Sequence, residues 1–116
     1  MWSKQNIVNC ILTDIVEECE TLNQLHKRSL KVGDTIILKT VNSVYLIKVL
    51  EEERYSVSGG WFDKSNLSPI RTTITGCTWG SSVIKKDIVA ACGLHLEFGN
   101  KVVTSRIKKI FHISSN

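Results

Sequence analysis

The sequence lacks several features that would place it in a specialised class. It has one proline, one methionine and two alanines. No apolar stretch approaches the roughly 20 residues that a membrane-spanning helix needs, so we expect no contact with a membrane. Four cysteines among 116 residues are too sparse for a secreted disulfide scaffold. The first residues also lack the uninterrupted apolar core of a signal peptide. The sequence therefore predicts a cytoplasmic protein with reduced thiols.

Residues that favour β-structure are abundant instead. Valine, isoleucine and threonine together make up 33 of the 116 residues. These β-branched side chains fit a pleated, half-buried surface better than a helix. Hydrophobic residues account for 42% of the chain and recur throughout it, which excludes general disorder. The length suits one domain, so we expect residues 1–116 to form a single, mainly β unit.

The N-terminal part has a different pattern. Over residues 3–27 apolar side chains recur at helical spacing, as Ile7, Ile11, Ile15 and Leu22 illustrate. This spacing predicts an amphipathic helix. Such a helix must bury its apolar face, so we expect it either to cap the remaining domain or to pack against a second copy of the chain as a homodimer.

From residue 32 onward the apolar pattern has a period of two, which is typical of strands. We expect five to eight short strands over residues 32–113, forming a small antiparallel barrel or a strongly bent sheet. The fold class is then α+β, mainly β. The first three strands form a meander at 35–41, 44–50 and 55–58, and a fourth strand covers 71–75.

Later segments of this region are less regular. Residues 76–82 are expected to form a loop or bulge, and 83–92 fits either a helix or a buried strand, of which we favour the strand. One or two last strands cover 102–107 and 110–113, and residues 114–116 are expected to fray.

Positive charge is concentrated near the C-terminus. Residues 71–116 carry a net charge of +5, whereas the whole chain carries +4. A basic segment of this kind can bind an anionic partner, including nucleic acid. It can equally be a solvated face that keeps the protein soluble.

Aromatic and basic side chains are the candidate binding residues. Trp61 and Phe62 follow two glycines, which allow the backbone to approach a partner closely. Aromatic rings on a small barrel can stack bases, cage a cation or anchor a peptide. Alternatively, Trp61 and Phe62 fill the ends of the barrel. The complete candidate set is Tyr45, Trp61, Phe62, Arg71, Trp79 and Arg106.

Signatures of catalysis are absent. No phosphate-binding loop, nucleophile elbow, dinucleotide-binding or zinc-protease motif occurs in the sequence. A polar pocket with Cys77 and His95, near Asp63 and Trp79, remains an option for a small enzyme. Cys92 and His95 have a spacing that suits zinc, but in a strand they point to opposite faces. We therefore predict no catalytic residues, no metal and no cofactor.

Three segments carry a resemblance to known sequences. They are residues 40–45 (TVNSVY), 58–62 (SGGWF) and 103–107 (VTSRI). At these positions the chain resembles a family of small, uncharacterised, β-rich bacterial proteins. The resemblance covers most of residues 30–113, and it implies no activity, cofactor or functional residue.

Three hypotheses of function remain open. The leading one is a small non-enzymatic cytoplasmic module that binds a ligand or a protein partner. The alternatives are a protein that binds single-stranded nucleic acid through its basic C-terminal third and its aromatic residues, and a small enzyme with a pocket near Cys77 and His95.

Overall fold

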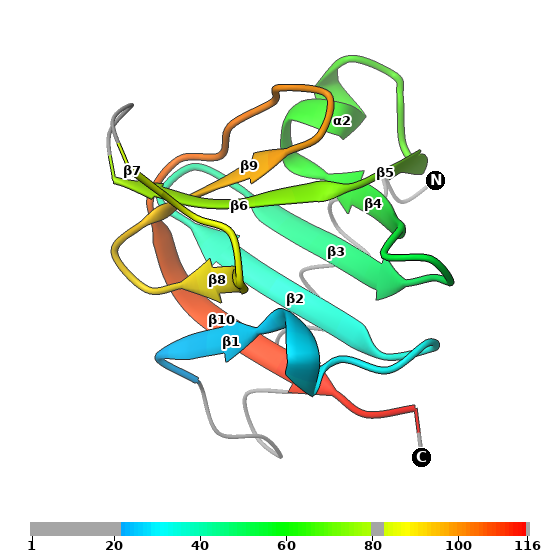
Figure 1. Cartoon of the computed structure of the whole chain (residues 1–116). Coiled ribbons are helices and arrows are strands. Elements are labelled where there is room, and N and C mark those ends of the chain that lie inside the picture. The colour runs from blue at the N-terminus through cyan, green and yellow to red at the C-terminus, as the bar shows by residue number, and fades with distance from the viewer. Residues whose placement is uncertain (1–21, 80–82, 116) are drawn as a thin grey trace.

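The structure, a computed structural model, describes residues 22–79 and 83–115, and these residues are mainly β (Figure 1). Most of the expected helix over residues 3–27, with Ile7, Ile11 and Ile15, lies outside the described residues. Its last part is wrong, because β1 (Gln24–His26) is a strand and η1 (Lys27–Ser29) is a 3-10 turn. Leu22 packs against the main core, and its amide donates a hydrogen bond to the Ile110 carbonyl oxygen at 3.0 Å.

Five strands form the largest sheet. Its order is β10-β2-β3-β4-β5, and every neighbouring pair is antiparallel. The expected meander is confirmed, since the strands over residues 35–40, 44–49 and 55–59 pair consecutively. The strands are β2 (Thr35–Thr40), β3 (Val44–Val49), β4 (Tyr55–Gly59), β5 (Ile70–Thr72) and β10 (Ile107–Ile113).

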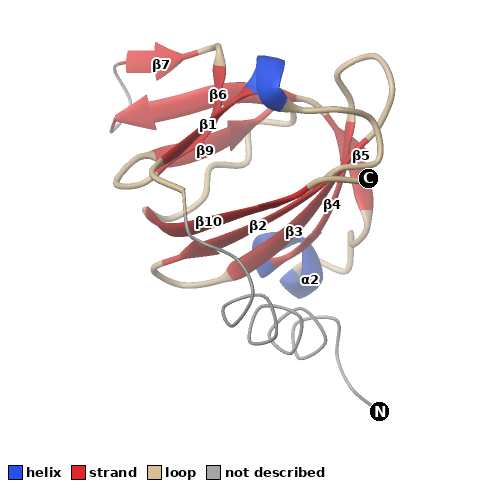
Figure 2. Cartoon of the chain, turned by 90° about the horizontal axis from the view of Figure 1, so that it is seen from below, coloured by secondary structure: helices blue, strands red, loops and turns tan. Residues whose placement is uncertain are grey.

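The remaining strands form a second layer over this sheet, as Figure 2 shows. One ladder has the order β7-β6-β9, and another pairs β1 with β8. The strands are β6 (Ile74–Trp79), β7 (Val83–Lys85), β8 (Ile88–Ala91) and β9 (His95–Phe98), and the short helix α2 (Gly60–Lys64) connects β4 to β5.

The expected α+β fold, with an N-terminal helix followed by a small barrel or a strongly bent sheet, is wrong. Within residues 22–79 and 83–115 the hydrogen-bonded ladders fall into three separate sheets, so the strands do not form a closed barrel. The chain leaves the large sheet at Thr73, between β5 and β6, and continues in the second layer. Residues 76–79 extend β6 instead of forming a loop. The strand favoured for residues 83–92 is confirmed, although it is divided into β7 and β8.

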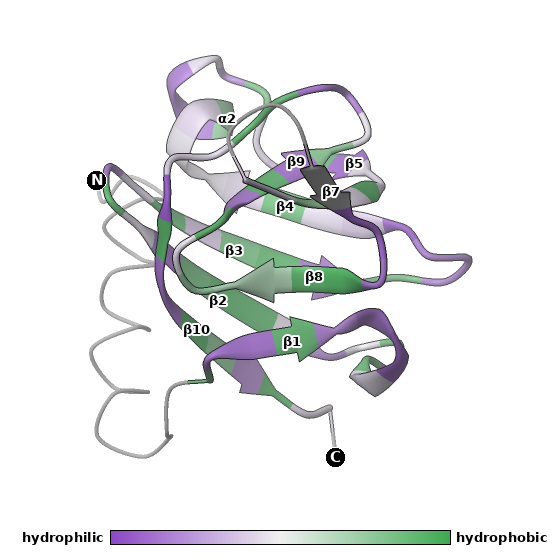
Figure 3. Ribbon diagram, turned by 60° about the vertical axis from the view of Figure 1, so that its left-hand side comes forward, coloured by the Kyte–Doolittle hydropathy of each residue, from purple (hydrophilic) through white to green (hydrophobic). Residues whose placement is uncertain are grey.

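Apolar side chains fill the space between the layers. All four residues of β8 are buried, and Figure 3 shows β8 among the hydrophobic segments (Figure 3). Ile36, Leu38 and Ile47 of the large sheet belong to the same core. A second apolar cluster contains Ile37, Val44 and Phe111, with Leu46 and Ile113 packed against it. Because neighbours along a strand point to opposite faces, the large sheet has buried residues on both sides.

A buried carboxylate connects the start of β2 to the end of β10. Asp34 is 1% exposed and accepts a hydrogen bond from His112 Nε2 at 2.7 Å. The backbone amides of Lys31 and Ser115 also donate to it, each at 3.0 Å. Burial alone raises the pKa of the Asp34 carboxyl, but these hydrogen bonds outweigh it and lower the pKa to about 2.

Candidate functional site

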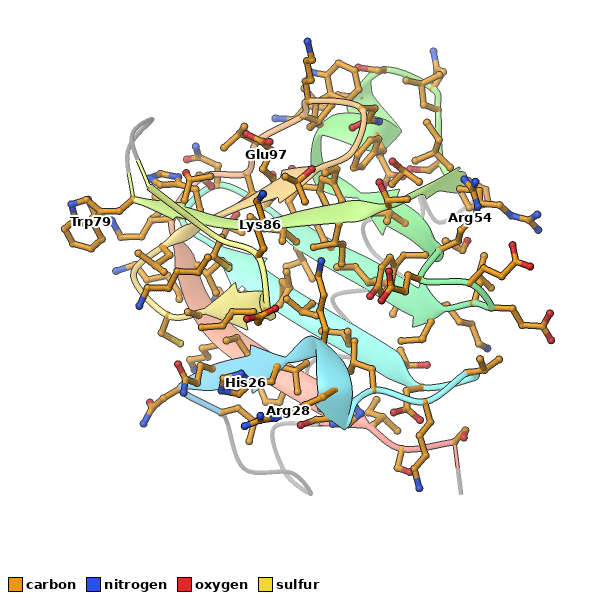
Figure 4. The ribbon with its side chains drawn as sticks, in the orientation of Figure 1. His26, Arg28, Arg54, Trp79, Lys86 and Glu97 are labelled. Atoms are coloured by element: carbon orange, nitrogen blue, oxygen red, sulfur yellow. The ribbon has the colours of Figure 1, made fainter. Side chains whose placement is uncertain are left out.

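Two basic segments that are far apart in the sequence meet at the surface. The backbone amide of Lys27 donates a hydrogen bond to the Asp87 carbonyl oxygen at 2.9 Å, which brings η1 beside the turn between β7 and β8. In Figure 4, Lys86 lies above His26 and Arg28 (Figure 4). Together these segments border a groove of about 960 Å³. The lining residues are His26, Lys27, Arg28, Glu53, Lys85, Lys86, Asp87 and Ile88.

The groove carries an excess of positive charge, because four cationic side chains line it together with only two carboxylates, Glu53 and Asp87. Lys27 is half-buried and donates from Nζ to the Ile74 carbonyl oxygen at 3.0 Å, so it belongs to the scaffold. Arg28, Lys85 and Lys86 are exposed, and their side chains make no hydrogen bond or ion pair with any described residue. Exposed cations that line a concave surface create a local potential that attracts anions.

A second hollow continues from this groove. It has a volume of about 500 Å³, and Lys85 lines both hollows. Its walls come from β1, β6 and the end of β8. Trp79, at the end of β6, is 66% exposed and extends from the edge of the molecule in Figure 4. The lining residues are Asn23, Gln24, Cys77, Trp79, Lys85, Ala91, Cys92 and Leu94.

The aromatic residues that were predicted from the sequence as binding residues do not form one surface. Tyr45 and Phe62 are buried, and the ring centroids of Phe62 and Phe98 lie 5.2 Å apart in the core. Trp61 is 45% exposed on α2, where its ring packs edge-on against Phe62 at 5.5 Å. Of these predicted aromatic residues, only Trp79 lines one of the two hollows that share Lys85.

The two glycines before Trp61 allow a close contact within the chain itself. A Cβ on Gly60 would lie 2.3 Å from the ring of Tyr45, and Gly60 has a φ of +49°. The partner that approaches the backbone closely is therefore Tyr45 of the same chain. This finding removes the reason for placing a ligand at Trp61 and Phe62.

The two arginines predicted as binding residues, Arg71 and Arg106, lie outside the groove. Arg71 is exposed on β5 and lines another hollow with Arg54, where Glu51 and Glu52 offset the positive charge. Arg106 is exposed before β10, and its carbonyl oxygen accepts a hydrogen bond from the amide of Val41 at 2.9 Å. Neither arginine lines the groove.

The side chains of Cys77 and His95 do not form a pair. Cys77 is opposite Leu96 in the ladder, whereas His95 is opposite Thr78, so the two side chains point to opposite faces. Burial raises the pKa of the Cys77 thiol to about 11. His95 Nδ1 donates to the Thr104 carbonyl oxygen at 2.8 Å. Asp63 makes a different contact: its Oδ1 accepts a hydrogen bond from the backbone amide of Gly59 at 3.1 Å.

Sequence reasoning missed His26, Lys27 and Arg28 as groove residues, because it placed them at the end of a helix. The one available signal was the pair of adjacent basic dipeptides, Lys27–Arg28 and Lys85–Lys86. Their proximity depends on the pairing of β1 with β8, which sequence spacing does not reveal.

Comparisons with known proteins leave the site to be interpreted from its own chemistry. No family model, curated protein or solved structure matches this chain. The resemblance to small bacterial proteins stays a prediction. Among the described residues, no cluster of three side chains suits a metal ion. No helix in that part of the chain has the length and apolar character required to cross a membrane.

Proposed function

We propose that this protein is a non-enzymatic binding module that holds an anionic ligand in the groove between η1 and the β7–β8 turn. One observation carries the proposal: Arg28, Lys85 and Lys86 line the same groove, and none of them forms an ion pair with a described residue. An excess of exposed cations on a concave surface attracts an anion, and the two carboxylates in the lining, Glu53 and Asp87, do not balance that excess.

The state of the thiols and of the polar side chains favours binding over catalysis. The Cys77 thiol is buried, and His95 points to the other face of its ladder. Both cysteines in the described part of the chain are free. Reduced thiols agree with the proposed cytoplasmic location.

The groove can be tested with inorganic polyphosphate, an anion that offers charge without bases or side chains. We expect binding whose affinity falls steeply between low and physiological salt. Replacing both lysines, as Lys85→Gln with Lys86→Gln, should weaken binding about tenfold, from two exposed charge contacts of roughly 0.7 kcal/mol each.

The chain offers a matched control for this double variant. Lys39 and Lys48 are exposed on the large sheet, on the face of the second apolar cluster, and they do not line the groove. The variant with Lys39→Gln and Lys48→Gln loses the same net charge and should bind as the parent does. Equal losses in both double variants, or no binding of polyphosphate at low salt, would overturn the proposal.

A further inference from the structure

Lys85 links the charged groove to the hollow that contains Trp79. It lines both, so a single elongated ligand can follow the surface from Arg28 and Lys86 past Lys85 to the indole ring. The neighbouring wall runs along β1 and η1, from Asn23 to Arg28. This path suits a short polymer better than a compact anion.

The exposure of Trp79 indicates the chemistry of that polymer. Its side chain is 66% exposed, although an indole is a large apolar surface. Trp61 differs, because its ring packs against Phe62 inside the same chain. No ring contact within the described residues involves Trp79. Trp79 shares its hollow with the exposed cation Lys85. An accessible ring near basic side chains is the combination that binds unpaired bases, which stack on aromatic faces while their phosphates contact the cations.

We infer that the anionic ligand is single-stranded nucleic acid, with a base stacked on Trp79 and the adjoining phosphates held by Lys85, Lys86 and Arg28. The inference rests on the proposed function and specifies its ligand. A duplex fits less well, because its bases stack on one another and leave no free face for the indole.

The test measures fluorescence anisotropy with labelled eight-nucleotide strands of mixed sequence and with abasic strands of the same length. Trp79→Ala should weaken binding of the base-containing strand by about tenfold, within the range known for one stacked base, and should leave the abasic strand unaffected. Trp79→Phe should retain part of the affinity. Trp61→Ala, at the partly exposed tryptophan outside the groove, should bind as the parent does.

Cys92 provides a second readout. It is exposed and lines the same hollow as Trp79, so a bound strand should slow its alkylation. Peptide mapping by mass spectrometry separates Cys92 from the other thiols. An abasic strand should protect Cys92 less than a base-containing strand does.

Each contrary result has a distinct meaning. Equal binding of both strands, or an unchanged affinity in Trp79→Ala, would overturn the inference and leave an anion site as proposed. Tighter binding of polyglutamate than of the oligonucleotide, lost in Trp79→Ala, would assign the site to an acidic peptide and overturn the inference. If neither polyphosphate nor the oligonucleotide binds, both the proposed function and this inference are overturned.

Discussion

Tyr45 and Trp61 are joined by a hydrogen bond of 3.3 Å, in which the backbone amide of Trp61 donates to the phenolic oxygen of Tyr45. The bond links the middle of the large sheet to the first turn of α2. Burial raises the pKa of the Tyr45 hydroxyl, and the hydrogen bond from Trp61 lowers it by a smaller amount. The hydroxyl is thus engaged within the chain, and the aromatic cluster around it stabilises the corner between β4 and β5.

Phe62 should contribute more to stability than to binding. Its side chain is fully buried, and its ring packs edge-on against those of Tyr45 and Phe98. Phe62→Ala should lower the free energy of unfolding by about 3–5 kcal/mol, through lost burial and the cavity left behind. Urea denaturation would measure this change. A loss below about 1 kcal/mol would show that the ring is not packed as described.

Gly59 should tolerate alanine less well than Gly93 does. Both have a φ near +90°, so alanine is strained at either position. A Cβ on Gly59 would also lie 2.2 Å from the Val44 carbonyl oxygen, whereas nothing lies within 4 Å of one on Gly93. We expect Gly93→Ala to lower the free energy of unfolding by about 1 kcal/mol and Gly59→Ala by clearly more. Equal losses in thermal and urea unfolding would contradict the close approach of β3.

Asp34 should make the protein sensitive to acid. Its pKa is about 2 in the folded chain against an ordinary value of 3.8, so the unfolded state binds its proton first as the pH falls. The stabilisation is therefore complete above the ordinary pKa and is lost as the pH falls toward about 2. Asp34→Asn should cost about 2 kcal/mol at neutral pH and flatten the acid limb of the stability curve. Unfolding free energies from pH 7 to pH 2 would test this, and an unchanged acid limb in the variant would refute it.

The two described thiols should react at different rates. Burial raises the pKa of the Cys77 thiol to about 11, and its Sγ donates to the Val89 carbonyl oxygen at 3.5 Å. Burial also raises the pKa of Cys92, but that residue is exposed. Because the thiolate is the reactive form, iodoacetamide should modify Cys92 well before Cys77 in the native protein. Peptide mapping over time would show the order, and simultaneous modification would indicate an open core.

Local pattern sufficed for the first β-meander. Residues 35–41, 44–50 and 55–58 were predicted as consecutive strands, and β2, β3 and β4 pair in that order. Hydrophobic alternation and a short turn at Asn42 and Ser43 involve only near neighbours, so they can be read directly. The same reasoning mistook residues 24–27 for a helix end. There, pairing with β8 overrides a helical spacing that Leu22 and Leu25 also satisfy.

Only the kinds of side chain at the candidate site could be predicted from the sequence. The sequence indicated cations and aromatic rings, and it named Trp79. It also indicated Tyr45 and Phe62, which are buried in the core. Arg71 and Arg106, which it indicated as well, lie away from the groove. Alternation along a strand shows which residues share a face, but it does not show which face another layer of the fold covers. Burial of an aromatic residue therefore depends on which sheet covers it.

The sequence by itself determined a chain rich in β-branched residues, its first strand pairings and its excess of positive charge, because these depend on composition and on neighbours along the chain. Only the tertiary structure decided that the strands form separate packed sheets instead of a closed barrel, and that Arg28 lines the same groove as Lys85 and Lys86. The physical reason is long-range pairing. The hydrogen bond between Lys27 and Asp87 joins residues whose proximity no local preference specifies.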